Sequence, residues 1–188
     1  MPWLLLSPAD VVTLDPDTAH RRLVLSEDRR SARWESAWQD LPDTPERFSD
    51  WCCVLGREGF TEGKHCWEVE LEGEVGGDAW WAVGVARGSV ERKGYKRLSP
   101  EGGIWAVWYQ KGEFLCLTSP RTPLPQSLLP RRIWVSLDCA QGLVAFIDAD
   151  RELEIFTFPP AVFNGESIHP WFLVGTEGTR LCLRGSTS

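Results

Sequence analysis

The sequence is poor in the residues from which most metal and cofactor sites are built. It contains three histidines, His20, His65 and His169, and its six cysteines include no Cys-x-x-Cys pair. Zinc sites of ordinary spacing need such pairs, so none is predicted. The motifs Gly-x-Gly-x-x-Gly, Gly-x-Ser-x-Gly and His-Glu-x-x-His are also absent. We therefore expect a protein that is not an enzyme and that needs no metal or cofactor.

Long apolar runs and an excess of positive charge are lacking too. No stretch approaches the roughly 18 apolar residues of a transmembrane helix, and the apolar run at residues 3–6 has no basic residues before it, unlike a signal peptide. The 27 acidic and 20 basic residues give a net charge of −7, which argues against general binding of nucleic acid or anionic membranes. We expect a cytoplasmic protein that neither inserts into a membrane nor binds nucleic acid.

The cysteines favour free thiols over disulfides. Cys66, Cys116, Cys139 and Cys182 each lie within an apolar, strand-like run, as buried thiols do. This pattern is typical of a reducing compartment, although an even number of cysteines leaves disulfides as the alternative.

The residues from Lys64 to Glu72 show the clearest local pattern in the chain. Trp67, Val69 and Leu71 fall on one side at period two, and Glu68 and Glu70 on the other. Such alternation predicts a strand of an antiparallel sheet with one packed and one wet face. Further short segments of strand character follow one another without a helical stripe, at residues 11–14, 23–25, 31–34, 48–56, 79–86, 104–109, 113–117, 133–139, 143–148, 153–158, 168–174 and 179–183. We therefore predict an all-β fold, an antiparallel β-sandwich of two sheets.

A polar segment with two prolines, residues 35–47, separates the first strands from the rest. Such a segment is typical of a boundary between subdomains. We expect a lead-in at residues 1–9, a small subdomain at 10–47 and a main subdomain at 48–184, forming one compact unit.

Three short motifs identify a family that the chain resembles. In order and spacing they match the signature motifs of the PRY-SPRY domain, and they read Leu14-Asp15-Pro16, Trp67-Glu68-Val69-Glu70 and Leu137-Asp138-Cys139-Ala140. The resemblance covers roughly residues 10–183. The third motif departs from the usual Leu-Asp-Tyr-Glu, because Cys139 and Ala140 replace the last two residues.

The resemblance is to the C-terminal domain of tripartite-motif ubiquitin ligases and of butyrophilins. It implies a bent, concanavalin-like jelly-roll sandwich with a short N-terminal PRY segment, which binds partners through loops at one end. In a tripartite-motif protein this domain would choose the substrate, whereas the RING ligase and any oligomerisation would belong to other domains of that protein. A protein or peptide ligand is therefore expected.

The resemblance also implies where the ligand binds. Matched residue by residue, the ligand-binding positions are Trp51, Trp81, Ala82, Arg97, Trp108, Gln110, Phe114, Arg121 and Thr176.

An argument from the residues alone supports one of these positions. Eleven tryptophans are more than a core of this size needs. Trp105 and Trp108 are three apart on one predicted strand, so they point to opposite faces, and if one is core the other faces outward. An outward Trp108 rimmed by Arg97 and Arg121 has the composition of an interaction hot spot. Packing roles are expected for Trp67, Trp80, Trp105 and Trp134.

Three other readings are kept as alternatives. Some butyrophilins bind phosphorylated small molecules through a cluster of His, Arg and Lys, but the matching positions here are Trp51, Ala82 and Leu115. A lectin-like glycan binder is the second alternative. A hydrolase is the least favoured, because His65 is expected to be packed and hydrogen-bonded, and neither His20 nor His169 has an evident Cys or Ser partner.

Overall fold

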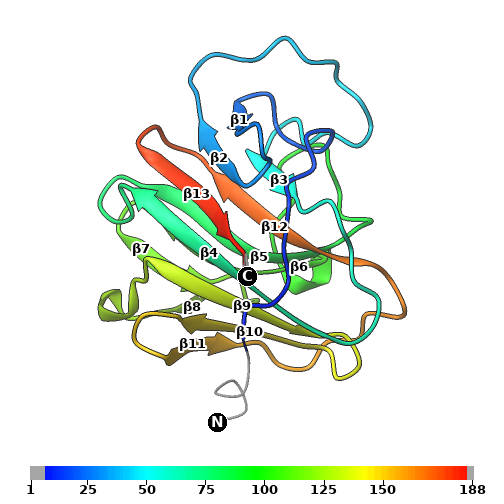
Figure 1. The fold of residues 1–188 in the computed structure, drawn as a ribbon, viewed down its shortest axis with the longest axis vertical. Helices are drawn as coiled ribbons and strands as arrows, with labels where there is room; N and C mark the ends of the chain where they lie inside the picture. The colour runs from blue at the N-terminus through cyan, green and yellow to red at the C-terminus, as the bar shows by residue number, and fades with distance from the viewer. Residues whose placement is uncertain (1–6, 186–188) are drawn as a thin grey trace.

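The structure, a computed structural model, describes residues 7–185, which form two antiparallel sheets packed face to face (Figure 1). The seven-stranded sheet has the order β1-β2-β13-β4-β9-β10-β11, and the six-stranded sheet has the order β3-β12-β5-β6-β7-β8. The strands are β1 (Leu23–Leu25), β2 (Ser31–Trp34), β3 (Cys53–Leu55), β4 (Lys64–Gly73), β5 (Trp80–Arg87), β6 (Ile104–Gln110), β7 (Glu113–Cys116), β8 (Thr122–Pro123), β9 (Arg132–Asp138), β10 (Leu143–Asp148), β11 (Leu153–Thr157), β12 (Ile168–Val174) and β13 (Thr179–Arg184). The predicted all-β sandwich is confirmed.

The strand β4 lies inside the seven-stranded sheet, between β13 and β9. Its side chains Trp67, Val69 and Leu71 are completely buried between the sheets, as their alternation predicts. On the outer face of β4, the carboxylate of Glu70 pairs with Arg184 at 2.6 Å. The apolar face of this strand therefore anchors the core, and its polar face carries ion pairs.

Two predicted strands are shorter than expected. Residues 11–14 contribute only one isolated bridge, between Leu14 and Gly56, and the predicted strand at 48–56 reduces to β3. The backbone N–H groups of Phe48 and Ser49 instead donate to carbonyls of other loops, at 3.0 and 3.2 Å. Because these two donors bind loop carbonyls, residues 48 and 49 do not continue the ladder of β3. That ladder extends only to the carbonyl of Cys52, which accepts the backbone N–H of Val174 at 3.2 Å.

The N-terminal residues share one core with the rest of the chain. Val12, Leu14 and Leu23 are buried in the same apolar cluster as Trp67. The buried Arg47 donates to the carbonyls of three loop residues at 2.8–3.0 Å, which are Pro16, Ala19 and Pro42. The predicted boundary between residues 47 and 48 therefore separates two parts that are packed together, and its position stays a prediction.

A long loop, residues 88–103 between β5 and β6, crosses the outer face of the six-stranded sheet. Leu98 from this loop packs against Phe48, Ile104 and Trp171 in a second apolar cluster. Lys93 fixes the loop to the N-terminal part of the chain, because its ammonium lies 2.7 Å from each of three oxygens, those of Asp43, Thr44 and Arg47. This loop and residues 42–51 together form a wall beside the exposed part of the sheet.

Candidate functional site

Four aromatic side chains meet on the outer face of the six-stranded sheet, and we call them the aromatic cluster: Trp51, Trp80, Tyr95 and Trp108. Trp80 and Trp108 come from the neighbouring strands β5 and β6, Trp51 precedes β3, and Tyr95 lies on the 88–103 loop. The ring centroid of Trp51 lies 6.4 Å from Trp80, 6.0 Å from Trp108 and 5.0 Å from Tyr95. The rings of Trp80 and Trp108 are 5.7 Å apart. The three contacts of Trp51 are edge-to-face, an arrangement that aromatic pairs prefer.

Hydrogen bonds and close packing fix the cluster in place. The indole N–H of Trp51 donates to the carbonyl of Lys96 at 3.0 Å. The backbone N–H of Trp80 donates to the hydroxyl of Thr176 at 3.0 Å, and its ring lies on Gly175 so closely that a Cβ there would be 2.3 Å from the ring. Tyr95 is 69% exposed at the edge of the cluster. The result is a rigid aromatic surface that is open to solvent.

Several predicted ligand-binding residues lie at this surface. Trp51 and Trp108 belong to the cluster, and Thr176 supports it. Ala82, which is opposite Trp108 in the sheet register, is completely buried beneath the rings as part of the floor. Gln110 is opposite Trp80 at the end of β6. The expectation that Trp105 and Trp108 face opposite ways is confirmed, because Trp105 is buried between the sheets.

Two other predicted residues point away from this surface. Trp81 is 0% exposed and Phe114 is 2% exposed. Both pack between the sheets, where their ring centroids are 6.1 Å apart. Neither side chain can touch a ligand on the outer face, so the assignment of Trp81 and Phe114 is corrected.

Trp80, and not the predicted Trp81, lies with the other aromatic rings on the outer face of the six-stranded sheet. Adjacent residues of a strand face opposite sides of the sheet, so only one of this pair can lie on the outer face. Residues 79–86 are apolar on both sides, and such a strand carries no pattern that tells the two faces apart. Tyr95 was missed for another reason, since a loop residue has no periodic signal.

The two arginines predicted at the rim differ in exposure and in the hydrogen bonds that they already make. Arg97 is exposed and borders a hollow of about 400 Å³ under the 88–103 loop, of which Trp51 is one wall. The guanidinium of Arg121 donates to the backbone carbonyls of Leu98 and Thr118. Burial lowers the pKa of Arg121, and the charge of Arg97 lowers it further. Arg97 is therefore the more accessible of the two arginines, whereas Nη1 of Arg121 is already bound to backbone carbonyls.

A serine and a histidine meet elsewhere, against expectation. The hydroxyl of Ser167 lies 3.0 Å from Nε2 of His169, whose Nδ1 is 2.9 Å from the carbonyl of Gly56. A Cβ added to Gly59 would lie 1.7 Å from the Ser167 hydroxyl. The backbone of Gly59 therefore packs against this hydroxyl, and the pair joins the start of β12 to the segment that contains Gly56 and Gly59.

His65 also has structural partners. His65 is stacked on Phe60 at 3.8 Å, and its ring nitrogens lie 3.0 Å from Asp10 and 2.8 Å from the carbonyl of Glu62. It is packed and hydrogen-bonded, as expected. Within residues 7–185 no group of three or more His, Cys, Asp or Glu side chains is placed to hold a metal ion.

The cysteines are all free thiols. Burial raises the pKa of the Cys66 thiol to about 12, and the carboxylates of Asp10 and Glu68 add to this effect. Burial likewise raises the pKa of Cys182 to about 11. Such thiols are poor nucleophiles at neutral pH.

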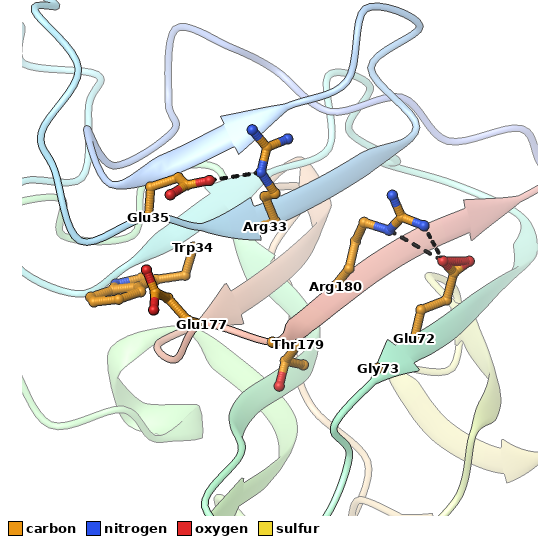
Figure 2. A pocket seen from close by; sticks show the side chains of 9 residues that line it. Arg33, Trp34, Glu35, Glu72, Gly73, Glu177, Thr179 and Arg180 are labelled. Atoms are coloured by element: carbon orange, nitrogen blue, oxygen red, sulfur yellow. Dashed lines mark hydrogen bonds and ion pairs between the residues drawn. The ribbon is translucent and has the colours of Figure 1, made fainter.

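A second hollow, of about 430 Å³, lies on the outer face of the seven-stranded sheet near the ends of β2, β4 and β13 (Figure 2). Both of its arginines are paired with carboxylates, whereas its third carboxylate, Glu177, has no ion pair within residues 7–185. Arg33 pairs with Glu35 at 2.9 Å, and Arg180 pairs with Glu72. This hollow therefore presents one unpaired carboxylate and no unpaired arginine among its lining residues.

The part of the chain that the structure describes has no helix of sufficient length and apolarity to cross a membrane.

Comparison with known proteins gives two family matches that together cover most of the chain. Residues 12–60 match the model of the SPRY-associated domain, PRY, and residues 64–185 match that of the SPRY domain. Butyrophilin subfamily 1 member A1 of Bos taurus is 46% identical over 169 residues, which are 90% of this chain and 31% of that protein. The E3 ubiquitin-protein ligase TRIM15 of Sus scrofa is 47% identical over 176 residues, which are 93% of this chain and 37% of that protein. The chain thus spans about a third of the length of these relatives.

A solved structure agrees in fold. The PSpry domain of TRIM65 superimposes with a TM-score of 0.79 at 23% identity, over 98% of this chain and 93% of that one. At this identity the likeness speaks for the fold alone. The two family matches over residues 12–60 and 64–185 show that this chain belongs to the PRY-SPRY family.

Proposed function

We propose that the chain is a recognition module that binds a protein or peptide through the aromatic cluster and does not change it chemically. The observation that carries the proposal is the meeting of three half-buried tryptophans with the exposed Tyr95, in contacts whose ring centroids are 5.0–6.4 Å apart. Trp and Tyr dominate the binding energy of protein interfaces, because a large rigid ring loses little entropy when it is buried.

The charges around the cluster favour a peptide over a phosphorylated small molecule. A diphosphate needs several convergent cations or N–H donors. Of the two arginines expected at the rim, Arg97 is exposed, whereas Arg121 is half-buried and its Nη1 already donates to two carbonyls. A single exposed guanidinium beside apolar rings suits a peptide that places one acidic or carbonyl group at the rim.

The context of the domain is also a proposal. Relatives include proteins named as E3 ubiquitin-protein ligases and others named as butyrophilins. We favour the substrate-binding domain of a cytoplasmic tripartite-motif ligase. The alternatives are a butyrophilin domain that senses a phosphorylated ligand, and a glycan-binding domain.

A comparison of variants tests the main proposal. Proteins captured from cell lysate by the wild-type domain should be lost with Trp108→Ala, because this change removes one wall of the cluster. Val162→Ser is the matched control, since Val162 is a 71% exposed apolar residue outside the cluster. Partners that are retained by Trp108→Ala as well as by the control would contradict the proposal.

Two further measurements decide between the alternatives. Titration calorimetry with inorganic diphosphate should give no saturable heat, and saturation at micromolar concentration would favour the phosphorylated-ligand alternative. A glycan array should show no specific binding, and a saturable glycan signal that Trp108→Ala removes would favour the glycan-binding alternative.

A further inference from the structure

A second aromatic group lies in the N-terminal part of the chain, and its rings alternate with cations. We call it the cation–aromatic stack: Trp34, Arg22, Trp38 and Arg21. The guanidinium carbon of Arg22 lies 5.7 Å from the ring centroid of Trp34 and 5.7 Å from that of Trp38. The guanidinium carbon of Arg21 lies 5.4 Å from the ring of Trp38. Distances below about 6 Å are those of cation–π contacts.

The loop that carries Trp38 is anchored by hydrogen bonds. The backbone N–H of Glu35 donates to the carbonyl of Arg22 at 2.8 Å, and that of Gln39 donates to the carbonyl of Arg21 at 2.9 Å. The side-chain amide of Gln39 donates to the carbonyl of Leu23 at 2.5 Å. Trp38 is nevertheless 58% exposed. An exposed ring on a fixed loop has little conformational entropy left to lose when a partner covers it.

The two arginines of the stack differ in whether the guanidinium already has hydrogen-bond partners. Arg22 lies between two rings and also donates to the carbonyl of Ser36. The guanidinium of Arg21 makes no hydrogen bond or ion pair with any side chain or carbonyl within residues 7–185. Arg33 is close in sequence, but its charge is matched by Glu35 at 2.9 Å. The stack therefore presents one exposed indole beside one unpaired cation.

We propose that the cation–aromatic stack is a second docking surface, which binds a protein segment where an aromatic side chain neighbours a carboxylate. The ring would cover Trp38, as offset or edge-to-face aromatic pairs do, and the carboxylate would take the paired N–H donors of Arg21.

Other occupants fit less well. A phosphate group requires more positive charge than one free guanidinium supplies. Nucleic acid needs several free cations, and this chain has a net charge of −7.

The stack adjoins the aromatic cluster, although the two surfaces are independent. The thiol of Cys52 lies 3.8 Å from Nδ1 of His20, which directly precedes Arg21 of the stack, and Cys52 directly follows Trp51 of the cluster. Trp34 also lines the hollow on the outer face of the seven-stranded sheet (Figure 2). A partner that covers the stack could therefore extend in either direction, and the stack can be tested without knowledge of the ligand at the cluster.

The test uses indole N–H signals of ¹⁵N-tryptophan-labelled protein and a capped hexapeptide of alternating phenylalanine and glutamate as the probe. We expect saturable shifts at the indoles of Trp38 and Trp34 that weaken as salt is added. Arg21→Gln keeps both rings and should weaken binding about tenfold, the loss of one charged hydrogen-bonded contact. Arg57→Gln is the matched control, because Arg57 is an exposed arginine outside the stack.

Comparison probes make each outcome decisive. Peptides with glutamine in place of glutamate, or alanine in place of phenylalanine, should shift these indoles much less. The proposal is overturned if the probe leaves Trp38 unshifted, if the glutamine peptide binds equally well, or if Arg21→Gln and Arg57→Gln bind alike. A phosphoserine peptide or a short RNA that binds the stack more tightly than the probe would also overturn it.

Discussion

Neighbouring tryptophans of this chain have opposite roles because their side chains leave the sheet on opposite sides. Trp81 is enclosed between the sheets, where its indole N–H donates to the carbonyl of Val75 at 2.8 Å. Trp80, one residue earlier, contributes to the aromatic cluster. A single residue's place on its strand thus decides whether a tryptophan stabilises the fold or is available to a partner.

Alanine substitutions should separate these two roles. Trp67→Ala removes a completely buried side chain and should lower the free energy of unfolding by about 3–5 kcal/mol. Trp108→Ala removes a half-buried ring at the surface and should change the melting temperature little while partner capture is lost. Denaturant unfolding of both variants checks this. A large destabilisation by Trp108→Ala would show that its ring belongs to the core.

The buried His20 should make stability depend on pH. Burial lowers its pKa, the charge of Arg22 contributes in the same direction, and its Nδ1 accepts the backbone N–H of Arg22 at 3.0 Å. In the unfolded chain histidine titrates near about 6.5. Below that pH the unfolded state therefore takes up a proton that the folded state resists, and stability falls as the solution is acidified.

His20→Asn tests this effect, because its amide oxygen can accept the same N–H and does not titrate. Denaturant midpoints between neutral and mildly acidic pH should fall less steeply for this variant than for the wild type. Equal slopes would show that His20 does not contribute to the pH dependence.

At the scale of elements, loops and turns decide the shape of the candidate site. The 88–103 loop supplies Tyr95 and Arg97, and Lys93 ties it to residues 43–47. The segment after β12 supplies Gly175, on which the ring of Trp80 rests. The sheet provides a flat support, and these connections turn it into a surface with walls.

Gly175→Ala should disturb the site without disturbing the fold. The backbone of Gly175 has no positive φ, so its conformation is one that alanine can adopt, but the added Cβ would lie 2.3 Å from the Trp80 ring and displace it. Partner affinity should fall with little change in melting temperature. Gly76→Ala is the matched control, since its Cβ would meet its nearest neighbour at an ordinary 3.4 Å. Unchanged affinity in Gly175→Ala would show that the position of Trp80 does not matter for binding.

At the scale of the whole molecule, the N-terminal residues are part of the one folded unit. They bring β1 and β2, which extend the seven-stranded sheet beyond β13 (Figure 1). They also bring buried core residues such as Leu14 and Leu23. Without them, β13 would become an exposed edge and part of the core would face water.

Removal of residues 1–47 should therefore abolish cooperative folding. The loss of core contacts at the β13 edge should leave a chain that aggregates or unfolds without a sharp transition. Circular dichroism during thermal unfolding measures this directly. A shortened chain with a cooperative transition at the wild-type temperature would show that residues 48–188 fold on their own.

Local residue order was sufficient to predict most strands and the sandwich, because alternation at period two and turn residues act between near neighbours. The three motifs that begin at Leu14, Trp67 and Leu137, in their order and spacing, likewise indicated the family. Three-dimensional packing alone selected Trp80 over Trp81, brought Tyr95 to the cluster and occupied the guanidinium of Arg121 with backbone carbonyls. These outcomes depend on contacts between segments far apart in the chain, for which a single sequence carries no periodic signal.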